Sequence, residues 1–479
     1  MKIKYLLLSV FMLALWSCET DVLNPNETYP DPYLEIDSGN TDFSTFVSVG
    51  ASITAGTTDG SLFLAGQMNS FPNILANVMS MADGGEFTQP YVNDNVGGLT
   101  LFGNVIAGPR LYFDGAGPAT VNGTPSTEVS NIMPGPYNNL GLPGMNAIHA
   151  LAPGYGNLEG VAAGLANPYF VRMASNPGTS ILEDALTQMP TFTSVWVGNN
   201  DILGFATSGG VTPITDSSEF DFAISSIVGA LAQAGADGII GNIPDITSIA
   251  FLNTVPYNAV PLDQATADML NGAFAVYNGA LQLVQMMGMI SAQEAAARTI
   301  VFAAGQNAVT IEDSDLTNLS VLGLPNLRMA TAEDKIVLPA ASVIGTTVGG
   351  NPMQINGVSV PLADNLVLTA NEVLEAQMAI ASYNGTISAL ASQYGWAHFD
   401  ANAALNEVST TGLMMDDFTV TGDLVFGGLF GLDGVHPTAR GNAIIAKLMM
   451  AEIDATYGSN LSDAGLDIGD YPTNYPNGL

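Results

Sequence analysis

Only three histidines occur in the 479 residues, and one of them, His436, follows Asp433 by three positions. Hydrolytic catalysis near neutral pH usually needs an imidazole that can take up a proton and return it. Positions i and i+3 share a face of a helical turn, so the Asp433 carboxylate can bind one ring nitrogen of His436. The other ring nitrogen is then free to act on a nucleophile. The pair therefore predicts a general base.

The best candidate for the nucleophile is Ser52. It lies in residues 50–56 (GASITAG), where the apolar, β-branched run 43–50 should turn into a helix. At such a turn the serine hydroxyl is open to solvent, and its backbone N–H lies at the positive end of the helix. Both properties suit a nucleophile whose acyl intermediate develops an oxyanion.

The other two histidines are weaker candidates. His149 lies in an apolar helical pattern, which predicts a packed or surface role. His398 precedes Asp400 by two residues, so these two side chains form a rival acid–base pair. The expected alternation of strand residues places His398 within a strand and not at its exit, which favours His436.

Strands and helices alternate along the chain and must position these side chains. Strand patterns occur at residues 43–50, 194–197, 238–242 and 396–400. Helical patterns follow at about 70–78, 218–235, 263–297, 369–395 and 438–458. This alternation predicts an α/β fold with a parallel sheet covered on both faces. Ligands of such sheets bind at the carboxyl ends of the strands, where Ser52 and Asn200 are expected.

Particular residues mark where helices begin. Ser70 is expected to cap the helix near 70–78, and Ser218 or Asp221 the helix near 218–235. Thr369 and Glu372 form a capping-box pattern before the helix near 369–395.

Two irregular segments interrupt this pattern and predict insertions at about residues 83–135 and 305–368. The first is rich in glycine, proline, asparagine and threonine, as expected of a long excursion between regular elements. The tail, residues 459–479, contains two Tyr-Pro pairs and is expected to be loosely ordered.

The N-terminus has the pattern of an export signal. Lys2 and Lys4 precede an apolar run too short to span a membrane, and the run ends before Cys18, the only cysteine of the chain. Residues 1–18 resemble a bacterial lipoprotein signal, although Trp16 stands where a small residue is usual. The resemblance implies lipidation of Cys18 and a lipid anchor in the bacterial outer membrane. Residues 19–41 are expected to be a flexible tether.

Composition excludes several classes of ligand. The chain has 47% apolar and 11% charged residues, which indicates a globular protein with a large core. The chain has 44 Asp and Glu but only 9 Lys and Arg. This negative net charge excludes nucleic acids and anionic lipid headgroups as partners. No phosphate loop or dinucleotide fingerprint occurs, so no organic cofactor is expected.

No metal site is expected either. The acidic clusters at residues 93–95 and 313–315 are predicted to be solvated loops. Five methionines at helical spacings are predicted to fill the core; they are Met286, Met287, Met289, Met449 and Met450.

Four short blocks carry a resemblance to a known family. They are residues 50–53 (GASI), 139–144 (NLGLPG), 198–201 (GNND) and 433–436 (DGVH). In this order they resemble the four blocks of the SGNH (GDSL-type) hydrolases, and in particular of the large lipoprotein members. The resemblance covers about residues 42–458. It implies a three-layer α/β/α, flavodoxin-like fold in that range, interrupted by the two insertions.

The resemblance also implies a role for each matching residue. Ser52 would be the nucleophile, His436 the general base, and Asp433 the carboxylate that orients the imidazole. The oxyanion hole would consist of the backbone N–H groups of Ser52 and Gly144 and the side-chain amide of Asn200.

Some positions depart from the family pattern or leave an alternative open. Ala51 stands where members commonly have aspartate, which puts the local loop geometry in question more than the reaction. Gly141 lies near Gly144 and is an alternative donor, although the spacing from Asn139 favours Gly144. Asp201 is expected to cap or brace a helix and not to act as a catalytic acid.

The activity that the resemblance implies is that of a lipid-anchored serine esterase or lipase, which hydrolyses acyl esters through an acyl-enzyme on Ser52. The substrate would be a small-molecule, lipid or carbohydrate ester, and no metal or other cofactor is implied. One alternative is a carbohydrate O-acetyl esterase on the same fold. The insertions hold few aromatic residues suited to stacking on sugars, which favours simple acyl esters; the best are Tyr91, Phe102, Tyr112 and Phe113. The other alternative is a non-catalytic, surface-binding lipoprotein.

Overall fold

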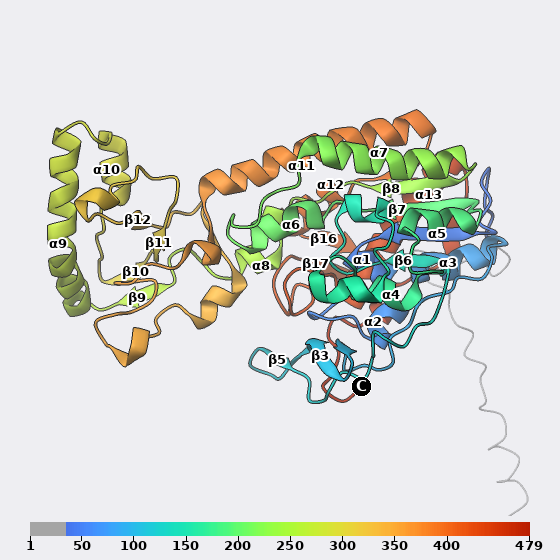
Figure 1. The fold of residues 1–479 in the computed structure, drawn as a ribbon, viewed down its shortest axis with the longest axis horizontal. Helices are drawn as coiled ribbons and strands as arrows, with labels where there is room; N and C mark the ends of the chain where they lie inside the picture. The colour runs from blue at the N-terminus through green and yellow to red at the C-terminus, as the bar shows by residue number, and fades with distance from the viewer. Residues whose placement is uncertain (1–34) are drawn as a thin grey trace, which may run out of the picture. The chain divides into compact units, whose positions relative to one another are not determined.

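A parallel sheet of five strands forms the centre of the fold in the computed structural model, which describes residues 35–479 (Figure 1). Its strand order is β15-β8-β7-β1-β6. The strands are β1 (Phe46–Gly50), β6 (Asn139–Gly141), β7 (Phe192–Trp196), β8 (Asp237–Gly241) and β15 (Ala397–Phe399). Counted along the chain this is the doubly wound, flavodoxin-like order. The predicted α/β class and the four predicted strands are confirmed.

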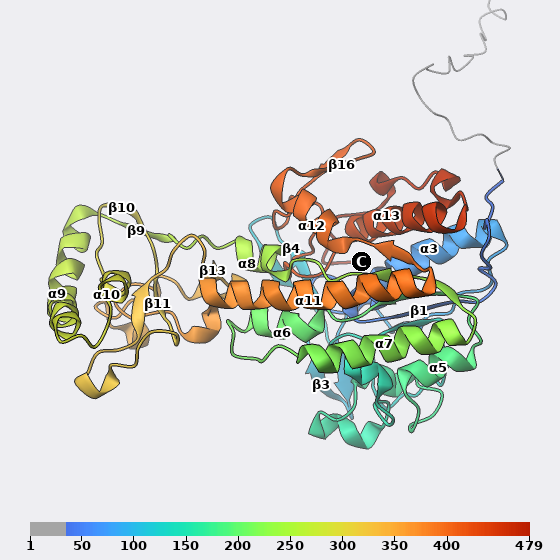
Figure 2. The same ribbon diagram turned by 90° about the horizontal axis from the view of Figure 1, so that it is seen from above.

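Helices cover both faces of the sheet. One face packs against α5 (Ile181–Thr187), α7 (Ser217–Gln233) and α11 (Ala370–Tyr394). The other packs against α3 (Phe71–Met79), α12 (Ala401–Thr410) and α13 (Ala439–Tyr457) (Figure 2). Because strand side chains alternate, Val47 and Val49 of β1 join the first core and Phe46 joins the second. The fold is therefore a three-layer α/β/α arrangement.

Two of the predicted helix starts are confirmed and one is wrong. The predicted capping box opens α11, where the backbone N–H of Thr369 donates to Glu372 Oε2 at 2.7 Å. Ser70 precedes α3 as expected, although its side chain makes no capping bond. The cap of α7 is Asp216, which accepts from the backbone N–H of Ser218, and not Ser218 or Asp221. The earlier aspartate can reach this N–H because its own backbone is still extended.

The first insertion forms two hairpins that are tied to the C-terminal tail. The hairpins are β2 (Leu99–Leu101) with β3 (Asn104–Ala107), and β4 (Leu111–Phe113) with β5 (Pro118–Thr120). Arg110, which is fully buried, donates to Asn95 O at 2.8 Å and to Pro476 O at 2.6 Å. Its guanidinium lies 4.9 Å from the ring centre of Phe63. The tail is thus packed, and the prediction of a loosely ordered tail is wrong.

The second insertion is larger than its sequence pattern indicates. Residues 256–366, the insertion lobe, gather at the N-terminal end of α11 (Figures 1 and 2). The lobe begins before β9 (Val260–Leu262) and includes the helical stretch predicted at 263–297, which the sequence pattern assigns to the α/β core. It therefore starts well before the predicted residue 305. That stretch is broken at Gly288 (φ 72°), and its two helices pack on each other and on lobe strands. The elements of the lobe and its base are α9 (Gln264–Met286), α10 (Ala292–Arg298), β9 (Val260–Leu262), β10 (Gly305–Asn307), β11 (Thr310–Glu312), β12 (Leu327–Met329), β13 (Lys335–Ile336) and β14 (Val367–Leu368).

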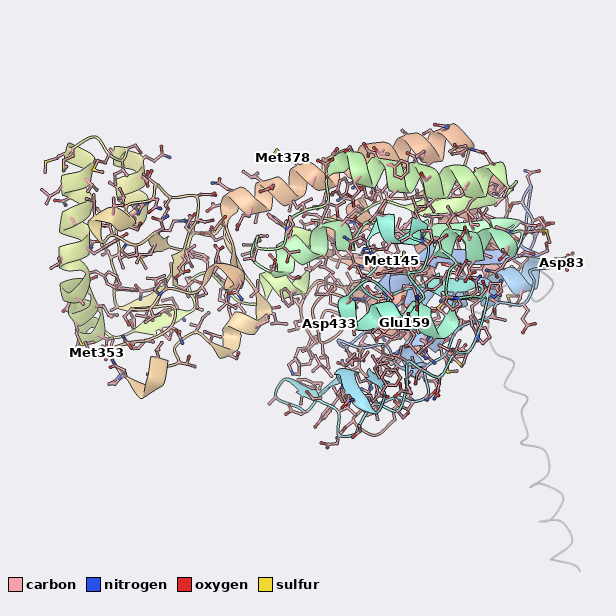
Figure 3. The ribbon with its side chains drawn as sticks, in the orientation of Figure 1. Asp83, Met145, Glu159, Met353, Met378 and Asp433 are labelled. Atoms are coloured by element: carbon pink, nitrogen blue, oxygen red, sulfur yellow. The ribbon has the colours of Figure 1, made fainter. Side chains whose placement is uncertain are left out.

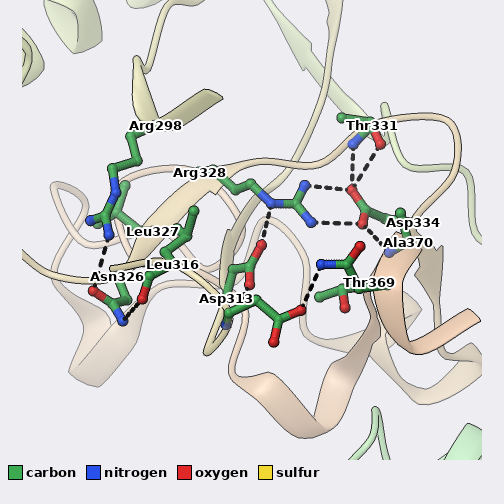
Figure 4. Close-up of polar contacts among 12 residues, drawn as sticks. Arg298, Asp313, Leu316, Asn326, Leu327, Arg328, Thr331, Asp334, Thr369 and Ala370 are labelled. Atoms are coloured by element: carbon green, nitrogen blue, oxygen red, sulfur yellow. Dashed lines mark hydrogen bonds and ion pairs between the residues drawn. The ribbon is translucent and has the colours of Figure 1, made fainter. Parts of the chain in front are cut away.

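A buried charge network holds the base of the lobe to α11 (Figure 4). Arg328 contacts Asp313 at 2.5 Å and Asp334 at 2.6 Å, and Asp334 also accepts from the backbone N–H of Ala370. Hydrogen bonds and charges from Arg328 outweigh burial and hold the pKa of Asp334 below its usual value. The prediction of a solvated acidic loop at residues 313–315 is therefore wrong for Asp313. Removing the guanidinium would leave its carboxylate partners buried without a countercharge.

Shorter elements complete the described chain. The α-helices and strands are α1 (Ser52–Ala55), α2 (Leu64–Met68), α4 (Pro168–Met173), α6 (Asn200–Thr207), α8 (Ala250–Asn253), β16 (Leu413–Met415) and β17 (Phe418–Val420). The 3₁₀ helices are η1 (Ser80–Ala82), η2 (Ala147–Leu151), η3 (Leu158–Ala163), η4 (Ile246–Ser248), η5 (Ser320–Leu322), η6 (Leu338–Ser342), η7 (Val348–Gly350), η8 (Asp364–Leu366), η9 (Leu461–Ala464) and η10 (Ile468–Asp470). Met353 lies in the insertion lobe and Asp433 in the α/β core (Figure 3).

The predicted signal, with Cys18, lies outside the described residues, as does most of the predicted tether. The last residues assigned to the tether are packed. The backbone N–H of Asn40 donates to Tyr457 O at 2.8 Å, and Thr41 Oγ1 donates to Asp237 Oδ2 at 2.8 Å. Among residues 35–479, no helix combines the length and apolar character needed to cross a membrane.

Candidate active site

Ser52, the first residue of α1, lies at the carboxyl end of β1, with one residue between it and the strand. The turn is tight. A side chain on Gly50 would come within 1.9 Å of Thr54 Oγ1 and 2.9 Å of Trp196 O, so only glycine fits there. This close approach of the strand end to α1 holds Ser52, which is 7% exposed, at the edge of the sheet.

His436 and Asp433 reach the same place from the loop that precedes α13. Ser52 Oγ lies 2.9 Å from His436 Nε2, and His436 Nδ1 lies 2.8 Å from Asp433 Oδ2. The structure thus brings together three side chains from segments separated by up to 384 residues. The order hydroxyl, imidazole, carboxylate is the arrangement in which a base can remove the hydroxyl proton while an anion stabilises the resulting imidazolium. The roles of the three residues in catalysis stay predictions.

The Asp433 carboxylate is held in its ionised form. Burial alone would raise its pKa, but the charge and hydrogen bond of His436 and the backbone N–H groups of His436 and Val435 outweigh burial and lower the pKa. The two backbone groups donate to Oδ1 at 2.9 and 2.8 Å. An anionic Asp433 fixes the tautomer of His436, because Nδ1 must carry the hydrogen and Nε2 is left as the acceptor for Ser52.

Besides Ser52, the two other proposed oxyanion donors, Gly144 and Asn200, follow β6 and β7. Asn200 is the first residue of α6, and its Nδ2 donates to Met145 O at 3.0 Å. An amide NH₂ carries a second hydrogen, which is available for a developing oxyanion. Asn200 and Ser52 line the same hollow. Gly144 has φ 78° and directly precedes Met145, whose carbonyl accepts the Asn200 amide. The oxyanion hole itself stays a prediction.

The contacts of Asn139 favour Gly144 over Gly141 as the proposed donor. The Gly141 N–H donates to Asn139 Oδ1 at 2.9 Å and is therefore occupied. Asn139 Nδ2 donates to Thr54 O at 3.0 Å, which ties β6 to the helix that begins with Ser52. In the described part of the chain, no hydrogen bond occupies the N–H of Gly144.

Asp201 is a brace, as predicted. Its Oδ2 accepts from the backbone N–H of Ala147 at 2.9 Å, which connects the loop after β7 to the segment that follows Gly144. Burial raises the pKa of Asp201 to about 6.

The two other histidines lie apart from this arrangement. His149 Nδ1 accepts from the backbone N–H of Asn146 at 3.2 Å, and its ring stacks on Tyr155 with 4.8 Å between centres, so the predicted packing role is confirmed. His398 lies within β15, as predicted. Its neighbour Asp400 caps α12 and accepts from Asn242, and within residues 35–479 no hydrogen bond joins Asp400 to His398.

Asp59 and Gly60 belong to the candidate site but carry no sequence signal for it. Gly60 N–H donates to Asp433 Oδ2 at 2.6 Å, and Asp59 Oδ1 accepts from the backbone N–H of Leu432 at 2.8 Å. These bonds bridge 373 residues. They fix the loop that carries Asp433 and His436 against the loop that follows α1. The dipeptide Asp-Gly predicts only a turn, and nothing in the sequence links that turn to residue 433.

A third contact fixes the same loop from α8, which packs against β13 at the base of the insertion lobe. Gly434 has φ 70°, and its carbonyl accepts from the backbone N–H of Phe251 in α8 at 2.8 Å. A side chain on Gly434 would lie 2.8 Å from that nitrogen. The backbone between Asp433 and His436 is therefore pressed against α8, which requires glycine at this position.

The buried carboxyl of Asp59 predicts a pH-dependent stability. Burial, with a contribution from the charge of Asp433, raises its pKa from 3.8 to about 6, against the hydrogen bond from Leu432 and the charge of Arg110. As the pH rises from about 4 to 6, the unfolded chain loses this proton first, so the folded state loses stability. Relative to Asp59→Asn, the free energy of unfolding of the wild type should fall by roughly 2–3 kcal/mol over this interval. Above about pH 7 the difference should not change further. Urea unfolding of both proteins from pH 4 to 8 measures the difference.

Asp114→Asn is the matched control for this measurement. Hydrogen bonds from the backbone N–H groups of Ala116 and Gly117 lower the pKa of Asp114, so its contribution to stability is lost only as the pH falls below about 4. The difference between the wild type and Asp114→Asn should therefore stay nearly constant from pH 4 to 8. A difference between wild type and Asp59→Asn that stays constant from pH 4 to 8 would contradict the assignment of a raised pKa to Asp59.

An apolar hollow opens beside Ser52 and His436. Its empty space is about 830 Å³ when the open solvent at its mouth is counted. It lies between α12, α13 and the loop that carries His436, and residues 244–249 form part of its wall. Its lining is Ser52, Ile53, Trp196, Asn199, Asn200, Leu203, Pro244, Ile246, Ile249, Phe399, Ala401, Ala404, Leu405, Val408, Leu413, Leu429, Phe430, Val435, His436, Pro437, Ile444, Ile445 and Leu448.

No group of three or more His, Cys, Asp or Glu side chains within residues 35–479 is arranged to hold a metal ion. No protein-family model matches the chain, and no curated protein matches its sequence. Two solved structures are similar, both mutants of one enzyme from Geobacillus stearothermophilus, described as an acetylxylan esterase and as an acetyl-xylooligosaccharide esterase. Each has 11% identity and a TM-score of 0.30, with 88% of this chain and 96% of the other covered. A TM-score of this size supports no conclusion about fold or function.

Proposed function

We propose that the protein is a serine esterase of the SGNH type that hydrolyses carboxylic esters through an acyl-enzyme on Ser52. The observation that carries this proposal is the continuous chain of contacts from Ser52 Oγ through His436 to Asp433, with distances of 2.9 and 2.8 Å. Ser52 is 7% exposed, and its hydroxyl contacts an imidazole whose second nitrogen is held by a carboxylate with a lowered pKa. In hydrolases this geometry activates the serine hydroxyl.

The first half of the reaction forms the acyl-enzyme. His436 Nε2 takes the hydroxyl proton while Ser52 Oγ bonds to the ester carbonyl carbon, and the carbonyl electron pair moves onto the oxygen. The resulting oxyanion would be stabilised by the N–H groups of Ser52 and Gly144 and by the Asn200 amide. When the carbonyl re-forms, the bond to the alcohol oxygen breaks, and the alcohol leaves with the proton from His436.

The second half releases the acid. A water molecule gives a proton to His436 Nε2 and adds through its oxygen to the acyl carbon. Collapse of this second tetrahedral intermediate breaks the bond to Ser52 Oγ, which recovers its proton from His436. Asp433 stabilises the imidazolium in both halves without taking up a proton itself.

Covalent labelling tests the proposal most directly. A fluorophosphonate should react with the protein at Ser52, and mass spectrometry of the digested protein should place the added phosphonyl group on the peptide that contains residue 52. His436→Gln should slow labelling strongly, since the hydroxyl then lacks its base. Absence of labelling would favour the alternative of a non-catalytic binding protein, whereas labelling at another serine would assign the nucleophile to that residue.

The lipid anchor on Cys18 stays part of the proposal and rests on the sequence pattern alone. It would place the esterase at the bacterial outer membrane after export. The intact mass of the mature protein decides it, because a lipidated protein should begin at Cys18 and exceed the mass of its polypeptide, and Cys18→Ser should lack the added mass.

A further inference from the structure

The apolar hollow beside Ser52 differs in chemistry from the rest of the chain. Its polar lining residues are the proposed nucleophile and base, Ser52 and His436, the proposed oxyanion donor Asn200, and its neighbour Asn199. The indole N–H of Trp196 also borders the hollow, but it donates to Asn242 O at 2.9 Å. Among residues 35–479, no Asp, Glu, Lys or Arg lines the hollow, although the whole chain has 53 of them.

This polarity decides which part of an ester can enter. A sugar hydroxyl moved into the hollow would lose its bonds to water and find no partner beyond the catalytic end, which is costly. A hydrocarbon chain has no hydrogen bonds to water to lose, and the burial of its apolar surface is favourable. The carbonyl carbon must lie at Ser52, and the acyl chain that extends from it can run between α12 and α13 along Ala404, Leu405, Val408 and Ile445.

We propose that the apolar hollow is an acyl-chain pocket, so that the enzyme prefers esters of unbranched carboxylic acids of several carbons over acetate esters. This inference rests on the proposed function of Ser52. It assigns the acyl side of the substrate to the interior between α12 and α13, and leaves the alcohol side at the mouth of the hollow.

The first test varies the acyl chain with a constant leaving group. For p-nitrophenyl esters from acetate to octanoate, kcat/KM should rise about fourfold for each added methylene that enters the pocket. The four methylenes that separate acetate from hexanoate therefore amount to roughly 250-fold. A parallel series keeps the acetyl group and lengthens an alkyl alcohol, and here kcat/KM should change little.

The second test narrows the hollow at a chosen place. Ala404 is half-buried and lines the hollow, whereas Ala403, its neighbour in the same turn of α12, is exposed. Ala404→Phe should reduce kcat/KM for hexanoate at least about tenfold while acetate is hydrolysed as before. Ala403→Phe, which adds the same ring on the outer face, should leave the whole series unchanged.

A third test of the acyl-chain pocket uses the wild type and does not depend on the folding of Ala404→Phe. Alkyl fluorophosphonates of increasing chain length should label Ser52 in the wild type at increasing rates. Equal labelling rates for all chain lengths, or a preference for acetate in the ester series, would contradict the acyl-chain pocket. The proposed esterase function would not be affected by either result. A dependence on the alcohol and not on the acyl chain would overturn it as well. Absence of labelling by every phosphonate would instead refute the proposed function.

Discussion

Ser52→Ala is expected to abolish the hydrolysis of short p-nitrophenyl esters, with kcat/KM falling by roughly 10⁵–10⁶-fold. The variant lacks the oxygen that must bond to the acyl carbon, and no other group in the site can replace it. The fold should survive, because among the described residues the Ser52 hydroxyl bonds to His436 and not to the surrounding core. Alanine also fits the same turn. Steady-state kinetics with the melting temperature and far-UV circular dichroism of both proteins check these two expectations together.

Ser48→Ala is the matched control for this loss. Ser48 lies four positions earlier on β1 and is fully buried, and its hydroxyl shares a hydrogen bond of 2.6 Å with Ser194. Its removal should cost roughly 1 kcal/mol of stability and leave kcat/KM within a few-fold of the wild type. If Ser52→Ala kept its activity, or if Ser48→Ala lost as much, the nucleophile would have to be sought elsewhere.

The sequence predicts those parts of the site that depend on local order. An apolar run followed by glycine is typical of a buried strand and its exit, and this pattern alone places Ser52 at the edge of the sheet. Asp433 and His436 are close in the chain, so the spacing of three residues is enough to pair them. The strand order then follows from the doubly wound topology, in which the exits of β1 and β7 are adjacent.

Contacts between distant segments could not be predicted in this way. The N–H of Gly60 on Asp433 and the carboxyl of Asp59 on Leu432 join loops that are far apart in sequence. An Asp-Gly turn has the same local pattern wherever it packs, so its partner is decided by the tertiary structure alone. These two bonds nevertheless hold the loop that carries both His436 and Asp433.

Side-chain type alone also fails to predict burial where a segment belongs to an insertion. Met449 and Met450 are 1% exposed, as predicted for core residues. Met286, Met287 and Met289 are 74%, 70% and 41% exposed, because they lie at or just after the end of α9 in the insertion lobe. The helical spacing of apolar residues predicts a helix in both places. Which other elements pack on that helix is decided by the tertiary structure. For the same reason the sequence pattern places the start of the lobe too late.

His436→Ala should be nearly as damaging as Ser52→Ala, with a fall in kcat/KM of roughly 10⁵-fold or more. Alanine also leaves the Asp433 carboxylate without its partner, so a loss of stability would confuse the result. His436→Gln separates the two effects, since an amide N–H can still donate to Asp433 but cannot carry a proton between serine and alcohol. The glutamine variant should therefore melt near the wild-type temperature and remain inactive.

His149→Ala provides the comparison that makes this result specific to one imidazole. His149 accepts from a backbone N–H and stacks on Tyr155, contacts that support η2 and involve neither Ser52 nor Asp433. Its loss should lower the melting temperature by a few degrees at most and change kcat/KM less than about threefold. Activity that survives in His436→Gln but disappears in His149→Ala would mean that the hydroxyl of Ser52 is not the group that attacks the ester. With the expected ranking, the base must be the imidazole held by Asp433, because neither of the other two histidines, His149 and His398, contacts a serine hydroxyl among the described residues.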